Sequence, residues 1–284
     1  MSAHSTNMHD DTMDLVSRLK AADEAFALAT VVRTVSVTAA KAGAKAVIHP
    51  DGRIIAGWIG GGCARGAVLR AARDALADGE PRLVSVQPET LLAELGVRPG
   101  ENRDGVRFAK NMCPSKGTMD IFVEPVLPRP SLVILGASPV ATALAEQASR
   151  FGFSVTVAAP AGDLSGNLSG APGADVVIDG YQLDRLTEAR RFIVVSTQGR
   201  GDEAALRAAV TLDAAYHAFV GSRRKMAALR QTLLADGVPA AALDRVKAPA
   251  GLDLGAITPE EIALSILAEV IRERRRGQRG EPPT

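Results

Sequence analysis

The sequence predicts an α/β protein of two domains, in which an N-terminal α/β domain precedes a Rossmann-like, doubly wound parallel sheet. Three observations support this prediction. Apolar strand-like segments alternate with helical segments after residue 130, as in βαβ units. Residues 127–130, Leu-Pro-Arg-Pro, favour an extended linker before that regular region. A chain of 284 residues is long enough for two domains, which we place at residues 1–127 and 128–284.

The first domain is predicted to begin with polar, disordered residues 1–12. Apolar spacing predicts helical segments at residues 13–26, 64–77 and 91–95. Strands are expected at residues 28–37, 43–49, 53–59, 82–86 and 119–126. Pro50-Asp51-Gly52 is a turn signal, so the second and third of these strands should form a hairpin. Residues 98–105 are polar and contain glycine, which predicts a loop.

The second domain repeats a strand-helix pattern to its end. Strands are expected at residues 131–135, 154–158, 176–178, 192–196 and 216–220. Helices are expected at residues 140–151, 183–190 and 203–212, from residue 223, and at residues 258–272. The last helix carries the strongest start signal, with Thr258 as N-cap, Pro259 at the first helical position and Glu261 completing a capping box.

Composition excludes several classes of function. Lysine and arginine total 33 and aspartate and glutamate total 32, so a net charge of +1 gives no indication of a nucleic-acid or membrane-surface partner. Two cysteines are too few for a disulfide framework, and the scattered histidines lack the spacing of a zinc site. No secretory signal and no membrane span is visible, so we expect a cytoplasmic protein.

The first candidate site is the Gly-rich turn Gly60-Gly61-Gly62-Cys63 between a strand and a helix. Glycines there leave the backbone N–H groups free to face an anion, and the helix start adds partial positive charge. The same position, next to Arg65, favours the thiolate form of Cys63 and predicts a lowered thiol pKa. The alternative interpretation is a tight turn with a buried, inert cysteine.

The second candidate is Cys113, in the loop before the strand at residues 119–126. Its segment Ser115-Lys116-Gly117-Thr118 lacks the glycine spacing and residue order of a phosphate-binding loop, so that interpretation is rejected. Cys113 is either a second functional thiol or a structural loop residue held by Pro114.

The third candidate is the turn that opens the second domain. Gly136, Ser138 and Ala141 approximate the dinucleotide-binding fingerprint, but serine replaces its second glycine. No acidic residue ends the following strand, which closes with Ala159-Pro160, so a partner for the NAD ribose is missing. The pattern predicts the Rossmann fold more firmly than NAD binding. An oxidoreductase using NAD(P) or FAD remains the alternative function.

Another alternative is a non-enzymatic docking module. Residues 221–225, Gly-Ser-Arg-Arg-Lys, open a predicted helix and either bind a phosphate or form a solvated positive end.

Several stretches together resemble the XdhC/CoxI family of molybdoenzyme maturation factors. The resemblance extends from about Ala29 to Val270 and depends on the order and number of the matching pieces. They are residues 29–34, 43–45, 61–63, Cys113 with 117–120 and 124–125, 220–225, 251–255 and 258–263.

The resemblance implies a cofactor domain followed by a Rossmann domain, in a chaperone rather than a catalyst. Such a protein would bind the molybdenum cofactor, as molybdopterin or its cytosine dinucleotide, and assist its sulfuration by a cysteine desulfurase. It would deliver the cofactor to a xanthine or carbon monoxide dehydrogenase and would often form a homodimer. Cys63 and Cys113 would then contact molybdenum or carry sulfur. The anionic tail would meet the Gly-rich turn and Arg65. Arg33 and Lys45 flank the same predicted sheet, and we expect them to be further contacts of the tail.

The sequence departs from the common family pattern near each motif. It reads Cys63-Ala64-Arg65 where Cys-Val-Glu is usual, and Cys113-Pro114-Ser115 where Cys-Gly-Gly is frequent. Ser138-Pro139 stands for Gly-His, and Thr197-Gln198 for Thr-His. These changes are typical of a divergent branch, such as one that serves carbon monoxide dehydrogenase-like enzymes. They also weaken the case for redox or metal chemistry in the second domain.

Overall fold

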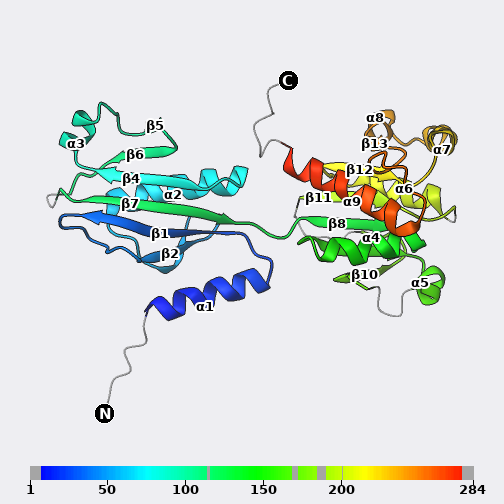
Figure 1. Cartoon of the computed structure of the whole chain (residues 1–284), viewed down its shortest axis with the longest axis horizontal. Coiled ribbons are helices and arrows are strands. Elements are labelled where there is room, and N and C mark those ends of the chain that lie inside the picture. The colour runs from blue at the N-terminus through cyan, green and yellow to red at the C-terminus, as the bar shows by residue number, and fades with distance from the viewer. Residues whose placement is uncertain (1–7, 114–115, 168–171, 184–189, 200, 277–284) are drawn as a thin grey trace, which may run out of the picture. The chain divides into compact units, whose positions relative to one another are not determined.

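The computed structural model describes residues 8–113, 116–167, 172–183, 190–199 and 201–276 (Figure 1). The side chains of residues 8–11, Cys63 and residues 165–167 lie outside the description. The chain divides into two compact units, Met1–Pro128 and Arg129–Thr284. Among the described helices, none is long and apolar enough to cross a membrane.

The first unit is built on one mixed sheet with the strand order β3-β2-β1-β7-β4-β6-β5. Its strands are β1 (Phe26–Val35), β2 (Lys45–Ile48), β3 (Ile54–Gly57), β4 (Arg82–Gln87), β5 (Asn102–Arg103), β6 (Val106–Lys110) and β7 (Thr118–Val126). The expected hairpin is confirmed, since β2 and β3 pair antiparallel with Val47 opposite Ala56. The long pairing of β1 with β7 forms the centre of the sheet.

Helices cover the two faces of this sheet unequally. Helix α2 (Gly62–Asp78) packs on one face, where Val68 and Ala71 join Val86 and Ile121 in the buried core. On the other face, α1 (Met8–Ala21) covers Phe26 and Val47, and α3 (Glu89–Glu94) contributes Leu92 to a small separate cluster. Because side chains alternate along a strand, each strand residue can be assigned to one face.

Three predictions for the first unit are wrong. Helix α1 begins at Met8, inside the segment expected to be disordered, and Thr12 is buried. It ends before Asp23, which takes a positive φ of 53°, so that Phe26 belongs to β1 rather than to the helix. The expected loop at 98–105 contains the short strand β5, which pairs with β6. A two-residue strand is too short for an alternation pattern to reveal.

The second unit is a Rossmann sheet, as predicted. Strands β8 (Ser131–Leu135), β9 (Ser154–Ala159), β10 (Val176–Asp179), β11 (Arg191–Val195), β12 (Tyr216–Phe219) and β13 (Val246–Lys247) run parallel. Their order is β10-β9-β8-β11-β12-β13, so the sheet reverses direction of growth between β8 and β11.

Helices lie on both faces of the second sheet. On one face pack α4 (Pro139–Ser149) and α9 (Pro259–Arg275), and on the other pack α6 (Asp202–Thr211), α7 (Arg223–Ala235) and α8 (Ala240–Asp244). A further short helix, α5 (Ala161–Asn167), follows β9 and was not predicted. The helix expected at 183–190 falls almost entirely outside the described residues.

Glu269 of α9 anchors the end of the second unit. Its side chain is fully buried, and its carboxylate accepts hydrogen bonds from Tyr216 Oη at 2.6 Å and from the backbone N–H of Gly251 at 3.0 Å. Lys247 and Arg272 form ion pairs with the same carboxylate. Burial opposes ionisation, but these donors outweigh it and lower the Glu269 pKa. This buried charge is therefore compensated by four donors, as a structural role requires.

Candidate functional site

A small cavity in the first unit lies where the Gly-rich turn meets the loop that carries Cys113. Its volume is about 30 Å³. It is lined by Thr38, Ala39, Gly61, Ala64, Val86, Asn111, Cys113 and Met119. Both candidate segments of the first domain, which are about 50 residues apart in sequence, thus contribute to one site. The volume exceeds the roughly 10–15 Å³ that a single water needs, so the cavity can take a small group but not a ring system.

The Gly-rich turn leaves the start of helix α2 open. Gly60 has a φ of +110°, a conformation that glycine adopts without strain. Gly61 is the N-cap residue, and no side chain among the described residues caps the helix there. A Cβ added to Gly61 or Gly62 would meet nothing within 4 Å, so no neighbouring group crowds either glycine. The first N–H groups of a helix have no partner within the helix, and together with the positive end of the helix dipole they are suited to binding an anion.

The Cys113 loop is held by Asn111. The Asn111 side chain accepts a hydrogen bond from the Cys113 N–H at 2.9 Å and donates one to the Gly117 carbonyl at 2.6 Å. The Asn111 backbone N–H donates to the Gln87 carbonyl at the end of β4. Gly117 is required for packing, because a Cβ there would overlap the Val37 carbonyl. Cys113 is a free and exposed thiol, so it is accessible to a ligand.

Asn111 is a site residue that our sequence interpretation missed. Asparagine commonly bonds to the backbone two residues further on, and Asn111 stands two residues before Cys113. That spacing was the available signal. Thr38 was also missed, because it comes from the loop between β1 and β2, and only the folded sheet brings this loop beside Gly117.

Cys63 is the second residue of α2, and its side chain lies outside the described part of the structure. The residues that flank it, Gly61 and Ala64, both line the cavity. A joint site for the two thiols therefore remains a prediction. Arg65 follows on the same helical turn and is exposed, with its N–H bonded to the Gly61 carbonyl at 3.0 Å.

The structure does not bring Arg33 and Lys45 to this cavity. Arg33 pairs with Asp120, which follows Met119 on β7 and so points to the opposite face of the sheet. Lys45 Nζ donates to Thr30 Oγ1 at 3.0 Å on that same face. Asp120 also accepts a hydrogen bond from Ser85 Oγ at 2.6 Å, which gives Arg33 a polar network of its own. A direct role for either basic residue at the start of α2 has no support in this geometry.

In the second unit, the predicted nucleotide turn is closed by local contacts. Gly136 packs against the Ser196 backbone so closely that a Cβ would overlap it. Ser138 is buried, caps α4 by accepting from the Ala141 N–H at 3.1 Å, and lies 2.7 Å from Ser196 Oγ across the switch point. The Ala141 N–H at the start of α4 is thus already bonded to Ser138 and is not free to donate to a pyrophosphate. The start of α4 is capped by Ser138, whereas no described side chain caps the start of α2. The NAD(P) or FAD alternative therefore has less support than an anion site in the first unit.

The basic segment 221–225 shows a similar internal pairing. Ser222 caps α7, and Lys225 Nζ pairs with the buried Asp202 at 2.5 Å and lies 5.5 Å from the Phe219 ring. Arg223 and Arg224 are exposed. Among the described residues, no group of three or more His, Cys, Asp or Glu side chains is placed to hold a metal ion.

Two protein-family models match this chain, one within each of its two units. The model of the XdhC and CoxI family matches residues 19–87, and the XdhC Rossmann domain model matches residues 132–270. The chain is 29% identical over 255 residues to the uncharacterized protein YqeB of Escherichia coli K12, covering 87% of this chain and 43% of that protein.

A second relative, from Bacillus subtilis 168, is named as a probable xanthine dehydrogenase subunit. It is 31% identical over 166 residues, covering 56% of this chain and 47% of that protein. The chain spans less than half the length of both curated relatives. A solved structure described as a xanthine dehydrogenase from Bacillus halodurans aligns with a TM-score of 0.47 at 20% identity, over 96% of this chain and 98% of the other.

Proposed function

The chain belongs to the XdhC and CoxI family, and from that membership and the cavity at the start of α2 we propose that it binds the molybdenum cofactor and assists maturation of a xanthine dehydrogenase-type molybdoenzyme. The observation that carries the proposal is that an uncapped helix start and a free thiol line the same cavity. The cofactor has an anionic phosphate or dinucleotide tail and a sulfur-bound metal, so it needs an anion cradle and a soft donor.

The residues present fit these two needs. The first-turn N–H groups of α2 would hold an anionic oxygen group, because Gly61 and Gly62 are exposed and no neighbouring group crowds them. The Cys113 thiol would provide a soft ligand or an acceptor for sulfur. When bound, the cofactor supplies the molybdenum and sulfur centre that the client enzyme requires. Since the cavity volume is about 30 Å³, it would receive only one end of the cofactor.

The finer parts of the proposal follow from the resemblance. We include sulfuration by a cysteine desulfurase, delivery to a client of the xanthine or carbon monoxide dehydrogenase type, and a cytoplasmic location. The cofactor would be molybdopterin or its cytosine dinucleotide. Cys113 lies on an exposed loop, which suits a thiol that must meet a partner protein as well as a ligand.

The test is retention of the cofactor by the purified chain. The chain is produced in molybdenum-replete cells, and bound molybdenum and pterin are measured by mass spectrometry for the wild type, Cys113→Ser and Cys63→Ser. We expect co-purification with the wild type and a loss of about tenfold or more for Cys113→Ser, because oxygen is a poor substitute for a soft sulfur donor.

Met112→Ser is the matched control, since Met112 is the exposed neighbour of Cys113 and does not line the cavity. It should retain the cofactor like the wild type. A wild-type chain that carries no molybdenum or pterin, or a Cys113→Ser variant that retains both and still matures the client enzyme, contradicts the proposal.

A further inference from the structure

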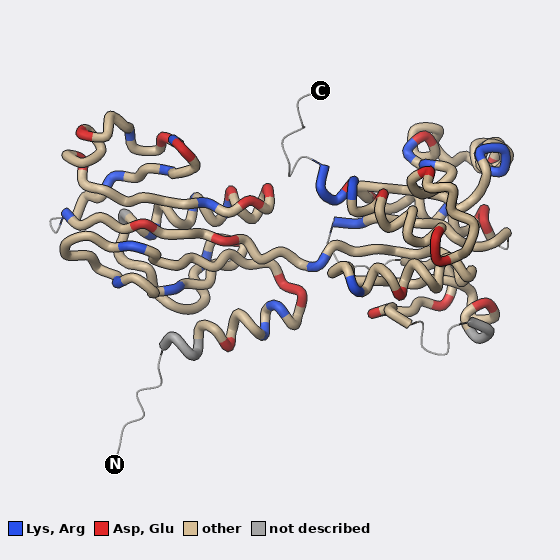
Figure 2. The backbone as a smooth tube through the Cα atoms, in the orientation of Figure 1, with Lys and Arg blue, Asp and Glu red and all other residues tan. Residues whose placement is uncertain are grey.

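An arginine cluster, made of Arg190, Arg274 and Arg275, lies at the amino-terminal edge of the second sheet. Arg190 directly precedes β11, and Arg274 and Arg275 end α9. Figure 2 shows basic residues gathered at the end of α9 and the start of β11. The predicted nucleotide turn, which begins at Gly136, follows the carboxyl end of β8. The arginine cluster is therefore on the opposite edge of the sheet from that turn.

Two of these guanidinium groups are held in place by aromatic rings and backbone carbonyls. The Cζ atom of Arg274 lies 4.6 Å from the centre of the Phe153 ring. That of Arg190 lies 5.6 Å from the centre of the Phe192 ring, and the two buried rings meet edge to face at 5.9 Å. Arg190 also donates to two carbonyls in the last turn of α9, at 2.9 and 3.0 Å. Both side chains are therefore positioned in advance of any ligand.

No carboxylate offsets the charge of these two arginines. Among the described residues, neither Arg190 nor Arg274 forms an ion pair, and Glu273 in the same turn of α9 pairs with other arginines instead. Within the same part of the chain, the buried Nε of Arg274 has no hydrogen-bond partner. Burial and the neighbouring charges of Arg275 and Arg190 lower the Arg274 pKa. An anion bound beside these guanidinium groups would relieve their repulsion.

Capping of α9 explains only one of the two arginines. Basic side chains favour the last carbonyls of a helix, and Arg190 bonds to two of them. Arg274 instead donates to the Phe151 carbonyl at 3.1 Å, and Phe151 follows the end of α4. The position of the Arg274 guanidinium is therefore not required by the end of α9.

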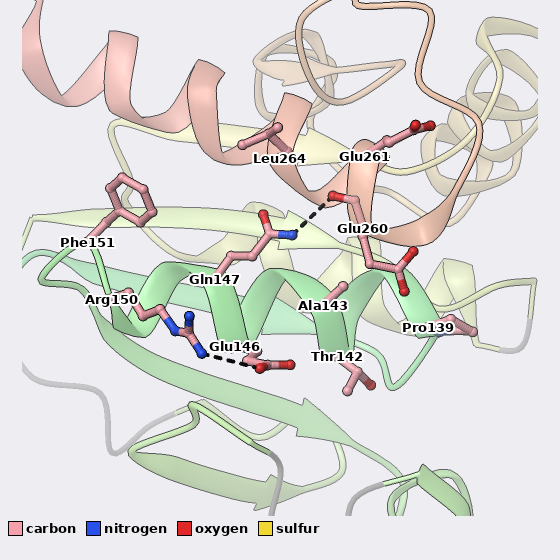
Figure 3. Close-up of a pocket in the computed structure, with 10 residues that line it drawn as sticks. All are labelled: Pro139, Thr142, Ala143, Glu146, Gln147, Arg150, Phe151, Glu260, Glu261 and Leu264. Carbon is pink, nitrogen blue, oxygen red and sulfur yellow. Dashed lines mark hydrogen bonds and ion pairs between the residues drawn. The ribbon is translucent and has the colours of Figure 1, made fainter.

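The arginine cluster borders one end of a groove between α4 and α9 (Figure 3). The groove has a volume of about 760 Å³, within the range of small-molecule sites. Arg150 and Phe151 line this end, and Phe151 is the residue to which Arg274 donates. The Arg150 side chain is 76% exposed, and its ion pair with Glu146 is long, at 3.7 Å, so its guanidinium is accessible. The acidic start of α9 lines the other end, which favours an anion only at the Arg150 end.

We infer that the arginine cluster and Arg150 bind a small polyvalent oxyanion, such as a diphosphate or a tricarboxylate, at this end of the groove. Guanidinium groups from α4, α9 and the segment before β11 can donate to separate oxygens of one ligand. A ligand with two or more negative charges matches several arginines better than a single carboxylate does. The inference goes beyond the proposed function and is independent of it, because every residue involved belongs to the second unit.

Binding of pyrophosphate and of citrate to the full-length chain, measured by isothermal titration calorimetry, tests the inference. We expect a Kd below about 100 µM for at least one of the two, and their relative affinities separate a phosphate ligand from a carboxylate ligand. Arg190→Gln and Arg274→Gln should each weaken binding by about tenfold or more, because each removes a charge-assisted contact. Arg190→Lys keeps the charge without the planar fork and should weaken binding less.

Arg224→Gln is the matched control, since it removes one exposed charge at the start of α7 and should bind like the wild type. Far-UV circular dichroism checks that each variant is folded. Arg150→Gln repeats the test on an exposed side chain if the stacked arginines prove necessary for folding. Gly61→Asp, which places a carboxylate at the start of α2, shows which of the two anion positions is being measured.

Two results would overturn the inference. One is a wild-type chain that binds neither pyrophosphate nor citrate with a Kd below about 1 mM. The other is binding that the folded arginine variants keep, including binding that Gly61→Asp alone abolishes, since that anion would then lie at α2. Loss of cofactor retention in the first unit would leave this site standing, and failure of this site would leave the cofactor proposal standing.

Discussion

Helices α2 and α9 have the same length of 17 residues, but they begin in opposite ways. The start of α9 is fully capped, since Thr258 accepts a hydrogen bond from the Glu261 N–H and Glu261 accepts one in return from Thr258. The start of α2 is preceded by glycines, and among the described residues no side chain caps it. Capping stabilises a helix, whereas free N–H groups can bind a ligand. The capping box therefore stabilises α9, and the uncapped start of α2 is consistent with the proposal that it binds an anion.

Glu269 tests whether α9 stabilises the second unit, and its substitution should give the largest change in the free energy of unfolding. Glu269→Ala removes a fully buried carboxylate and leaves the Tyr216 hydroxyl without its partner. We expect a loss of about 3 kcal/mol in the free energy of unfolding of the second unit, measured by urea denaturation. Glu203→Ala, which breaks a half-exposed ion pair with Arg207, is the control and should cost less than about 1 kcal/mol. A loss that small for Glu269→Ala would show that its donors contribute little.

Removal of the cap on α9 should have a smaller effect. Thr258→Ala deletes the side-chain half of the capping box and should lower the free energy of unfolding by about 1 kcal/mol. Thr258→Ser keeps the acceptor oxygen and should restore most of the loss. If Thr258→Ala were as stable as the wild type in the same denaturation experiment, the capping box would not stabilise α9. The contrast between the starts of α9 and α2 would then have no energetic basis.

The pH dependence of stability tests a buried group of the second unit. His217 is 3% exposed, and burial lowers its pKa from the ordinary value of 6.5, although its hydrogen bond to the Leu212 carbonyl opposes that shift. The folded state therefore binds this proton less well than the unfolded state. Its contribution to stability is present above pH 6.5 and is lost as the pH falls through the lowered value. The midpoint temperature of thermal unfolding should fall less steeply for His217→Gln than for the wild type as the pH is lowered from about 7 to 5. Parallel curves would contradict this.

The sequence predicted the regular parts of the fold because their signals are local. The βαβ alternation predicted the parallel Rossmann sheet, and the capping box of Thr258 and Glu261 is confirmed. The start of α1 and the strand β5 were missed, because a polar helix start and a two-residue strand carry little periodic signal.

The site could be predicted only in part, for a different reason. Glycine and cysteine marked its two segments, but the pairing of β4 with β7 and the position of Asn111 depend on contacts between distant residues. Arg33 and Lys45 were assigned to the site from their strands alone. The face on which each lies is decided by register, and a one-residue shift reverses it.

The smallest expected change in stability is also the sharpest test of the comparison. Gly61 has φ −82° and ψ −168°, an ordinary extended conformation for an N-cap residue, and a Cβ there has free space. Gly61→Asp should therefore cap α2 and raise the free energy of unfolding by a few tenths of a kcal/mol. The same carboxylate would occupy the anion position and repel the cofactor.

We thus expect Gly61→Asp to be slightly more stable than the wild type and to retain less than about a tenth of its molybdenum and pterin. Ser17→Asp, on the exposed side of α1, adds the same charge to the first unit away from the cavity and should leave retention unchanged. A Gly61→Asp variant that gains stability and keeps its cofactor would mean that the open start of α2 is not the anion site. Loss of both stability and cofactor would mean that Gly61 serves the fold, and the contrast between α2 and α9 would then not separate binding from stability.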